Sequence, residues 1–99
     1  MKKLFLGLLF GSNLLFAQDL KVMTYNIRLS LESDKENSWD YRKEDALALM
    51  SYYHPDYFGV QEAVPQQMDD IKTSLKDYDY VGVGRDDGKN QGEYSAIFY

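Results

Sequence analysis

Two short segments of the chain end in side chains that could take part in divalent-metal chemistry. Residues 21–28 carry Asn26, and residues 57–62 end in Gln61 and Glu62. Mg²⁺ prefers oxygen ligands, keeps several waters and typically takes one or two protein carboxylates beside substrate phosphates. Glu62 is therefore the candidate metal ligand, and Asn26 is suited to hydrogen bond a phosphate oxygen or a metal-bound water. Spacing alone supports equally well an alternative in which both are ordinary polar residues at strand ends.

Both segments have the composition of β-strands. Residues 20–27 alternate loosely and contain Val, Thr, Tyr and Ile, which favour strands. Residues 57–61 are short and largely apolar, as expected for an interior strand. If one helix connects them, the strand–helix–strand unit brings Asn26 and Glu62 to the same end of a sheet.

The stretch between the two strands is predicted to be a loop followed by one helix. Residues 29–38 are polar and rich in Ser, Asp, Glu and Asn, which is typical of an exposed loop. Asn37 or Ser38 can cap a helix, and Pro55 ends it because proline disfavours helical geometry in the residue before it. The apolar face of this helix is predicted from residues at helical spacing: Trp39, Ala46, Met50 and Tyr53.

The remaining residues continue the α/β pattern. Pro65 suits the first turn of a second helix, which is predicted to run through Lys76. Residues 78–83 alternate again and are expected to form a third strand, and residues 93–99 begin a fourth. The connection between these strands contains Asp86-Asp87-Gly88 and is rich in turn-forming residues. The apolar stripe of the second helix is expected to consist of Met68, Ile71 and Leu75.

Residues 1–17 are predicted to be a secretory signal peptide. Lys2 and Lys3 form a basic region, an apolar stretch follows over residues 4–16, and Ala17 is a small residue at the expected cleavage position. An uncleaved membrane anchor is the alternative, although the stretch is too short for a comfortable membrane span. Residues 18–99 are then the mature part, and the protein is expected to be exported to the periplasm or the extracellular space.

Composition limits the chain to one domain and disfavours binding to polyanions. The chain has 99 residues, no cysteine and a formal net charge of −5. Removal of the two lysines in the signal peptide leaves 9 basic against 16 acidic residues, so the net charge becomes −7. Such an acidic chain is a poor non-specific partner for DNA or anionic membranes. Stable membrane insertion of the mature part is not expected.

His54 and the tyrosines could carry chemistry but are more simply interpreted as structural. His54 is the single histidine and a possible general base. It precedes Pro55 at the end of the first helix, and a crossover unit places that position at the end of the sheet opposite Glu62. A role at the helix C-terminus is therefore favoured. The nine tyrosines could form a sugar platform, but most fall on positions where packing explains them.

Several motifs together resemble the opening of the endonuclease/exonuclease/phosphatase superfamily. They are residues 24–28 (TYNIR), Trp39 with Arg42, residues 55–56 (PD) and residues 61–62 (QE). The resemblance extends over residues 20–99. It implies an α/β fold, the N-terminal half of a four-layer α/β/β/α sandwich with mixed β-sheets, as in deoxyribonuclease I.

The same resemblance implies roles for individual residues. Glu62 would be the principal ligand of Mg²⁺, with Mn²⁺ as an alternative metal, and Asn26 an active-site amide near the metal and the scissile phosphate. Glu93 would orient a catalytic histidine, and Arg85 could contact a substrate phosphate. For Glu93 the alternative is a surface acid between loop and strand, and for Arg85 a residue of a solvated loop.

The implied activity is Mg²⁺-dependent hydrolysis of a phosphoester by an exported enzyme. Its substrate would be a phosphorylated small molecule, a phospholipid headgroup or a nucleic acid, and the full-length protein would be a monomer. A secreted endonuclease of the same family and a non-catalytic secreted binding module with this fold are the alternatives.

The chain is also predicted to be the front part of a longer protein. Residues 96–99 are apolar and carry no stop signal. The family's catalytic histidine, its Asp-x-Asn pair and its closing Asp-His pair are not in these 99 residues. The chain alone is therefore expected to be inactive.

Overall fold

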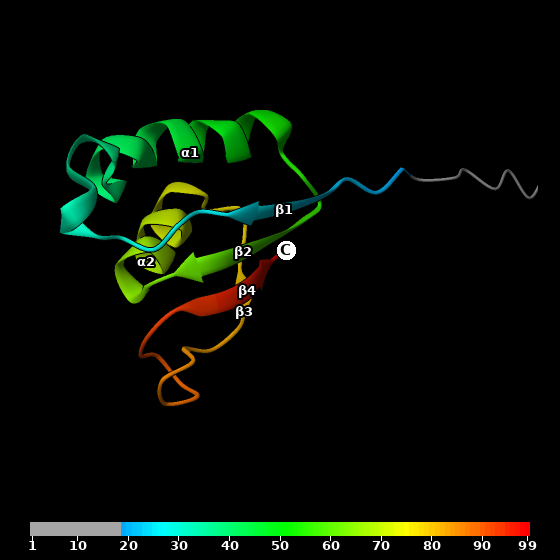
Figure 1. Ribbon diagram of the computed structural model, residues 1–99. Coiled ribbons are helices and arrows are strands. Elements are labelled where there is room, and N and C mark those ends of the chain that lie inside the picture. The colour runs from blue at the N-terminus through cyan, green and yellow to red at the C-terminus, as the bar shows by residue number, and fades with distance from the viewer. Residues whose placement is uncertain (1–18) are drawn as a thin grey trace, which may run out of the picture.

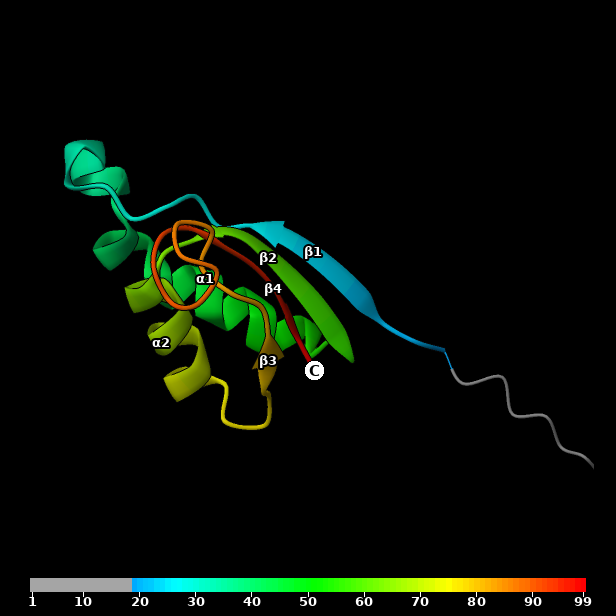
Figure 2. The same ribbon diagram turned by 90° about the horizontal axis from the view of Figure 1, so that it is seen from below.

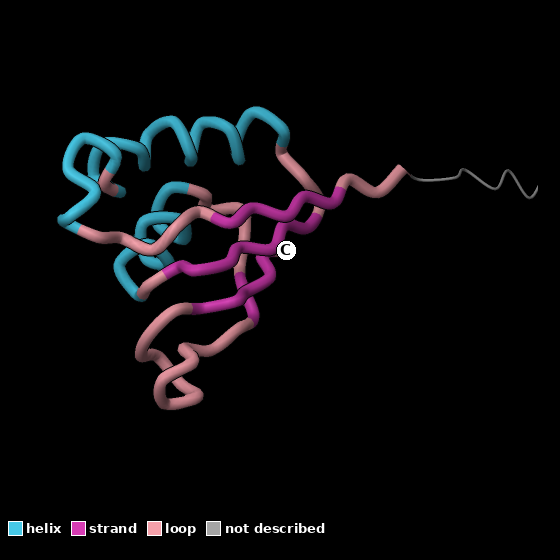
Figure 3. Tube along the Cα trace, viewed as in Figure 1, coloured by secondary structure: helices cyan, strands magenta, loops and turns pink. Residues whose placement is uncertain are grey.

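The computed structural model describes residues 19–99, so the predicted signal peptide lies outside the described residues. Strands and helical segments alternate along the chain until its end, where two strands follow one another, as the sequence predicts (Figures 1 and 3). They are β1 (Val22–Asn26), the 3₁₀ segment η1 (Glu32–Asn37), α1 (Trp39–Tyr53), β2 (Tyr57–Ala63), α2 (Pro65–Ser74), β3 (Tyr80–Val81) and β4 (Tyr94–Phe98). No helix within this range is both long enough and apolar enough to cross a membrane.

The four strands form one mixed sheet in the order β1-β2-β4-β3. β1 and β2 are parallel, with Val22 opposite Tyr57 and Asn26 opposite Gln61. β4 is antiparallel to both of its neighbours. A parallel pair needs a crossover connection, and α1 provides it. The predicted strand–helix–strand unit and the mixed α/β fold class are therefore confirmed.

Both helices lie on the same face of the sheet (Figure 2), and the core lies between them and the strands. Phe58 of β2 is completely buried, stacks on Phe98 of β4 with 4.7 Å between ring centroids, and meets Tyr78 edge-on at 5.0 Å. β4 alternates strictly between buried and exposed residues, the pattern of a sheet covered on one face.

The other face of the sheet is uncovered within residues 19–99. Val22, Val81 and Ile97 are exposed there, and half of the Ile97 surface is accessible to solvent. This one-sided burial agrees with the predicted half of a sandwich, in which a second sheet would pack against this face.

The first helix packs against the core through Trp39, Ala46 and Met50. Trp39 is completely buried, and its indole Nε1 donates a hydrogen bond of 2.8 Å to Asp70 on α2. The predicted helix face is correct for three residues and wrong for Tyr53, which is 56% exposed. Tyr53 at the C-terminal end of α1 instead lines an open hollow with Met23 and Pro55.

Several predicted boundaries are wrong. The stretch 29–38 is not only loop, because η1 occupies Glu32–Asn37 with a break at Lys35. α2 ends at Ser74, two residues before the predicted end. The third strand is limited to Tyr80–Val81, since Tyr78 is instead anchored in the core and donates a hydrogen bond of 2.6 Å to the Pro55 carbonyl.

Unequal losses of folding stability are expected when large apolar side chains are removed from the two faces of the sheet. Phe58→Ala should destabilise the chain by about 3–5 kcal/mol because it leaves a cavity beside Phe98 and Tyr78. Ile97→Ala, on the uncovered face, should cost far less. Urea denaturation followed by Trp39 fluorescence measures both, and equal costs would contradict the assignment of the core face.

Candidate active site

The C-terminal ends of β1 and β2 bring Asn26 and Glu62 into contact. The two strands are parallel and in register up to Asn26 and Gln61. The Asn26 Nδ2 group donates a hydrogen bond of 3.0 Å to Glu62 Oε1. The juxtaposition predicted from the sequence is therefore observed, and an amide and a carboxylate face the same space.

A β-bulge turns Glu62 toward that space. Phe58 and Val60 face the helices, so strict alternation would bury Glu62 beneath them as well. Instead the pairing of β2 with β4 shifts between Val60 and Ala63, and Glu62 adopts a left-handed backbone with φ 63°. Ala63 takes the buried position, and the Glu62 side chain is freed for the site.

An open pocket of about 920 Å³ lies over these strand ends. All four side chains predicted to act in a site line it: Asn26, Glu62, Arg85 and Glu93. They come from β1, β2 and the connection between β3 and β4. The pocket is completed by Gln61, Gly82, Val83 and Ser95.

Arg85 and Glu93 form an ion pair at the side of the pocket supplied by the β3–β4 connection. Arg85 Nη1 donates to Glu93 Oε2, and the Arg85 backbone N–H also donates to the Glu93 carbonyl at 3.1 Å. Arg85 is largely exposed, whereas Glu93 is partly buried. The guanidinium thus stands where it can reach a phosphate while Glu93 holds it in place.

The connection that carries Arg85 is fixed by its own hydrogen bonds. Asp87 accepts the backbone N–H groups of Lys89, Asn90 and Gln91 at 2.8–3.0 Å. These bonds, led by that from Gln91, hold the pKa of Asp87 below its usual value. Gly84 is required here because an added Cβ would lie only 2.2 Å from the Gln91 carbonyl oxygen.

One ion pair lies beside the Asn26–Glu62 contact. Arg28 binds Asp34 of η1 through two hydrogen bonds of 2.7 Å. Their mutual hydrogen bonding raises the pKa of Arg28 and lowers the pKa of Asp34 from its ordinary value of 3.8. This pair was not predicted from the sequence, since nothing in the polar stretch marks Asp34 as different from its neighbours.

The donor groups in the pocket fit a metal ion that is shared with water and substrate. No group of three or more His, Cys, Asp or Glu side chains among residues 19–99 is placed to hold a metal. Glu62 offers a carboxylate, while Asn26 directs its Oδ1 to the Arg28 N–H at 3.0 Å. A single carboxylate suits Mg²⁺, which keeps most of its waters, and does not suit a closed all-protein metal cage.

His54 lies away from this pocket, as the sequence predicts. It caps the C-terminus of α1 in a left-handed conformation, and its N–H donates to the Met50 carbonyl at 3.0 Å. The chain enters β2 just after it, at the end of the sheet opposite Glu62.

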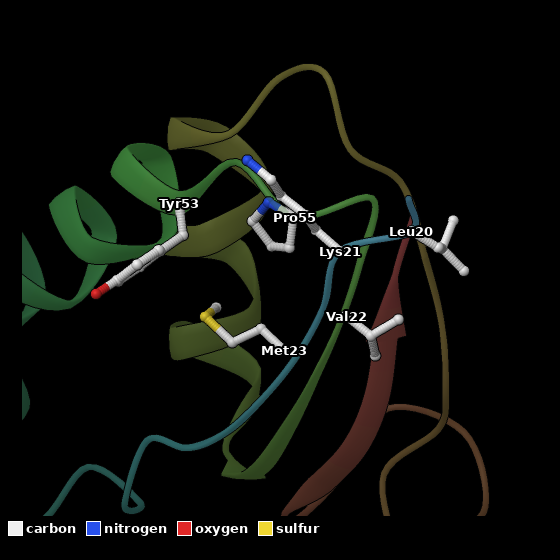
Figure 4. A pocket seen from close by; sticks show the side chains of 6 residues that line it. All are labelled: Leu20, Lys21, Val22, Met23, Tyr53 and Pro55. Atoms are coloured by element: carbon white, nitrogen blue, oxygen red, sulfur yellow. The ribbon is translucent and has the colours of Figure 1, made fainter. Parts of the chain in front are cut away.

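A second hollow, of about 440 Å³, lies where β1 begins. Figure 4 shows Met23 and Tyr53 on the side of β1 toward α1, while Leu20 and Val22 point to the other side. Its walls are mainly apolar and hold no carboxylate or imidazole. It therefore offers no side-chain ligand of the kind that Mg²⁺ prefers.

Solved structures similar to this chain carry the same fold. The endonuclease/exonuclease/phosphatase from Bacteroides vulgatus is 40% identical with a TM-score of 0.80, over 83% of this chain and 31% of that one. A mannosyl-6-phosphatase from Bacteroides thetaiotaomicron is 43% identical with a TM-score of 0.77, over 82% and 31% of the two chains. An endonuclease/exonuclease/phosphatase family protein from the same species is 45% identical with a TM-score of 0.77, over 81% and 30%. No protein-family model matches the chain, and no curated protein does.

These similarities confirm the resemblance to the endonuclease/exonuclease/phosphatase family and the deoxyribonuclease I-like fold class. The chain spans only 30–31% of the length of these neighbours. What it shares with them is therefore one segment of the fold.

The left-handed backbone of Glu62 should be visible in stability measurements. A residue with a Cβ is disfavoured in this conformation and glycine is not, so Glu62→Gly should be more stable than Glu62→Ala by about 1 kcal/mol. Urea denaturation of the two variants checks this. At Gln61, which precedes the bulge, the Gly variant should instead be the less stable of the corresponding pair.

Proposed function

We propose that this chain contributes the metal-binding side of the active site of an exported, Mg²⁺-dependent phosphoester hydrolase. The observation that carries the proposal is the contact between Asn26 and Glu62 at the head of an open pocket that also holds Arg85. Its support from known proteins is the similarity to endonuclease/exonuclease/phosphatase family structures, one of them a mannosyl-6-phosphatase.

Each side chain would have a distinct task in this site. Glu62 would hold Mg²⁺, which stabilises negative charge on a phosphoryl group when bound. Asn26 keeps one Glu62 oxygen in place through its amide hydrogen bond. Arg85 would bind a phosphate oxygen of the substrate, and Glu93, now paired with Arg85, would orient a histidine supplied by another part of the protein.

A phosphorylated sugar or similar small molecule is the substrate class we favour. The chain carries 16 acidic against 11 basic residues, which opposes binding of a long polyanion. The pocket itself is open on the solvent side and contains one exposed guanidinium, enough for a single phosphate group. The 43% identical mannosyl-6-phosphatase supports the same choice.

Export is proposed from the sequence alone. The basic, apolar and small-residue regions of residues 1–17 have the order of a signal peptide. Absence of cysteine is compatible with either side of a membrane, so the pattern at the N-terminus carries this part of the proposal.

The 99-residue chain by itself should not hydrolyse phosphoesters. Its single histidine lies at the end of the sheet opposite Glu62, so no imidazole of this chain can serve the pocket. The purified chain, assayed with Mg²⁺ on mannose 6-phosphate and on bis(p-nitrophenyl) phosphate, is expected to give only background rates. Turnover that disappears on chelation of the metal would contradict this expectation.

In a full-length protein that contains this chain, Glu62→Gln should lower kcat/KM for the phosphoester at least about 100-fold. Loss of a metal ligand removes several kcal/mol of transition-state stabilisation. Glu44→Gln, an exposed position on α1, removes the same charge outside the pocket and is the matched control. Unchanged turnover in Glu62→Gln would remove Glu62 from the metal site, and no turnover in the unaltered protein would favour a binding module.

A further inference from the structure

Gln67 is the one polar side chain that is completely buried among residues 19–99. It lies in the first turn of α2 and does not line the pocket. Burial of an amide is costly unless its donors and acceptors are paired. The hydrogen-bond partners of Gln67 therefore show which parts of the structure this side chain connects.

The Gln67 amide joins the start of α2 to the chain that leaves β1. Its Oε1 accepts the N–H of Val64 at 3.1 Å, which caps its own helix, and the N–H of Ser30 at 3.0 Å. Its Nε2 donates to the Arg28 carbonyl at 2.8 Å. Two of these three bonds cross to residues more than 35 positions earlier in the chain.

Arg42 of α1 holds the same stretch from another side. Its guanidinium donates to the Ile27 carbonyl at 3.0 Å and to the Asn37 carbonyl at 2.6 Å. The group lies over the ring of buried Trp39, 5.7 Å from its centroid. The two consecutive carbonyls of Ile27 and Arg28 are thus each fixed by a side chain from a helix.

This stretch needs support because Arg28 has a left-handed backbone, with φ 57°. A residue with a Cβ pays of order 1–3 kcal/mol for such a conformation unless its surroundings favour it. The turn matters for the pocket because the Arg28 N–H donates to Asn26 Oδ1 at 3.0 Å. With Oδ1 held in this way, the Nδ2 end of the Asn26 amide faces Glu62.

We propose that Gln67 is a positioning residue for the active site, with Arg42 as its partner. Gln67 holds the Arg28 carbonyl, and Arg42 holds the Ile27 carbonyl of the peptide that carries the Arg28 N–H. That N–H orients the Asn26 amide, and Asn26 holds Glu62. This inference rests on the proposed function for its consequence in catalysis, but the chain of contacts itself can be tested without metal or substrate.

Gln67→Glu is the variant that separates positioning from folding. A glutamate keeps an acceptor for Val64 and Ser30 and suits the first turn of a helix. It cannot donate to the Arg28 carbonyl, and it brings a carboxylate oxygen toward that oxygen. The matched control is Gln66→Glu, which adds the same charge at the exposed neighbouring position.

The first measurement is NMR of the 99-residue chain without metal. The unaltered chain should show nuclear Overhauser contacts between the Asn26 side-chain amide and the Glu62 side chain. Gln67→Glu should lose them while the signals of the Phe58 core persist, and Gln66→Glu should keep them. Unchanged Asn26–Glu62 contacts in folded Gln67→Glu would overturn the proposal. If Gln67→Glu does not fold, Arg42→Lys, which removes the guanidinium but keeps the charge at this partly buried position, is expected to weaken the same contacts, and their persistence there would overturn the proposal equally.

The second measurement is a double-mutant cycle in the full-length protein. Gln67→Glu should lower kcat about 10-fold or more with little change in KM. In an Asn26→Ala background it should have almost no further effect, because Gln67 acts through Asn26. If the reductions in kcat caused by Gln67→Glu and Asn26→Ala multiply in the double variant, the role of Gln67 is merely structural. The proposed function is tested separately, because unchanged turnover in Glu62→Gln would contradict it. Failure of the proposed function can therefore be distinguished from failure of the positioning role of Gln67.

Discussion

The left-handed backbone at Glu62 is the constraint on which the pocket depends. One extra residue in β2 moves Ala63 into the core and turns the carboxylate out of it. Without that bulge the alternation of the strand would place a charge beneath the helices, where burial without a partner is very costly. The strain at this position is small beside that cost, and strained backbone of this kind clusters at functional sites.

The core and the candidate site lie in two regions of the same sheet. The helix-covered face carries the aromatic core around Phe58 and Phe98, whereas the pocket lies at the C-terminal ends of β1 and β2. Gln67 connects the two regions because it is buried at the start of α2 and bonds the chain that leaves β1. A substitution near the site can therefore alter geometry without removing core packing.

The sequence predicts the order of elements and the meeting of Asn26 with Glu62, because apolar runs and prolines mark strands and helix ends clearly. The sequence does not reveal the bulge, because the residue with the left-handed backbone is Glu62 and not a glycine, which would have indicated such a conformation. Gln67 was also missed, although its place three residues after the residue that precedes α2 is a capping position that could have marked it. The exposure of Tyr53 depends on where α1 ends relative to its neighbours, which local spacing cannot show.

The pocket is assembled from two parts that are held independently. Gln67 and Arg42 fix the ends of β1 and β2, whereas Asp87 orders the connection that presents Arg85. The parts are joined through the pairing of β2 with β4, where Ala63 faces Tyr94 just beyond the bulge. Under the proposed function, the first part would set metal binding and the second the contact with substrate phosphate. A change in the β3–β4 connection could then alter substrate choice while the geometry around Glu62 stays the same.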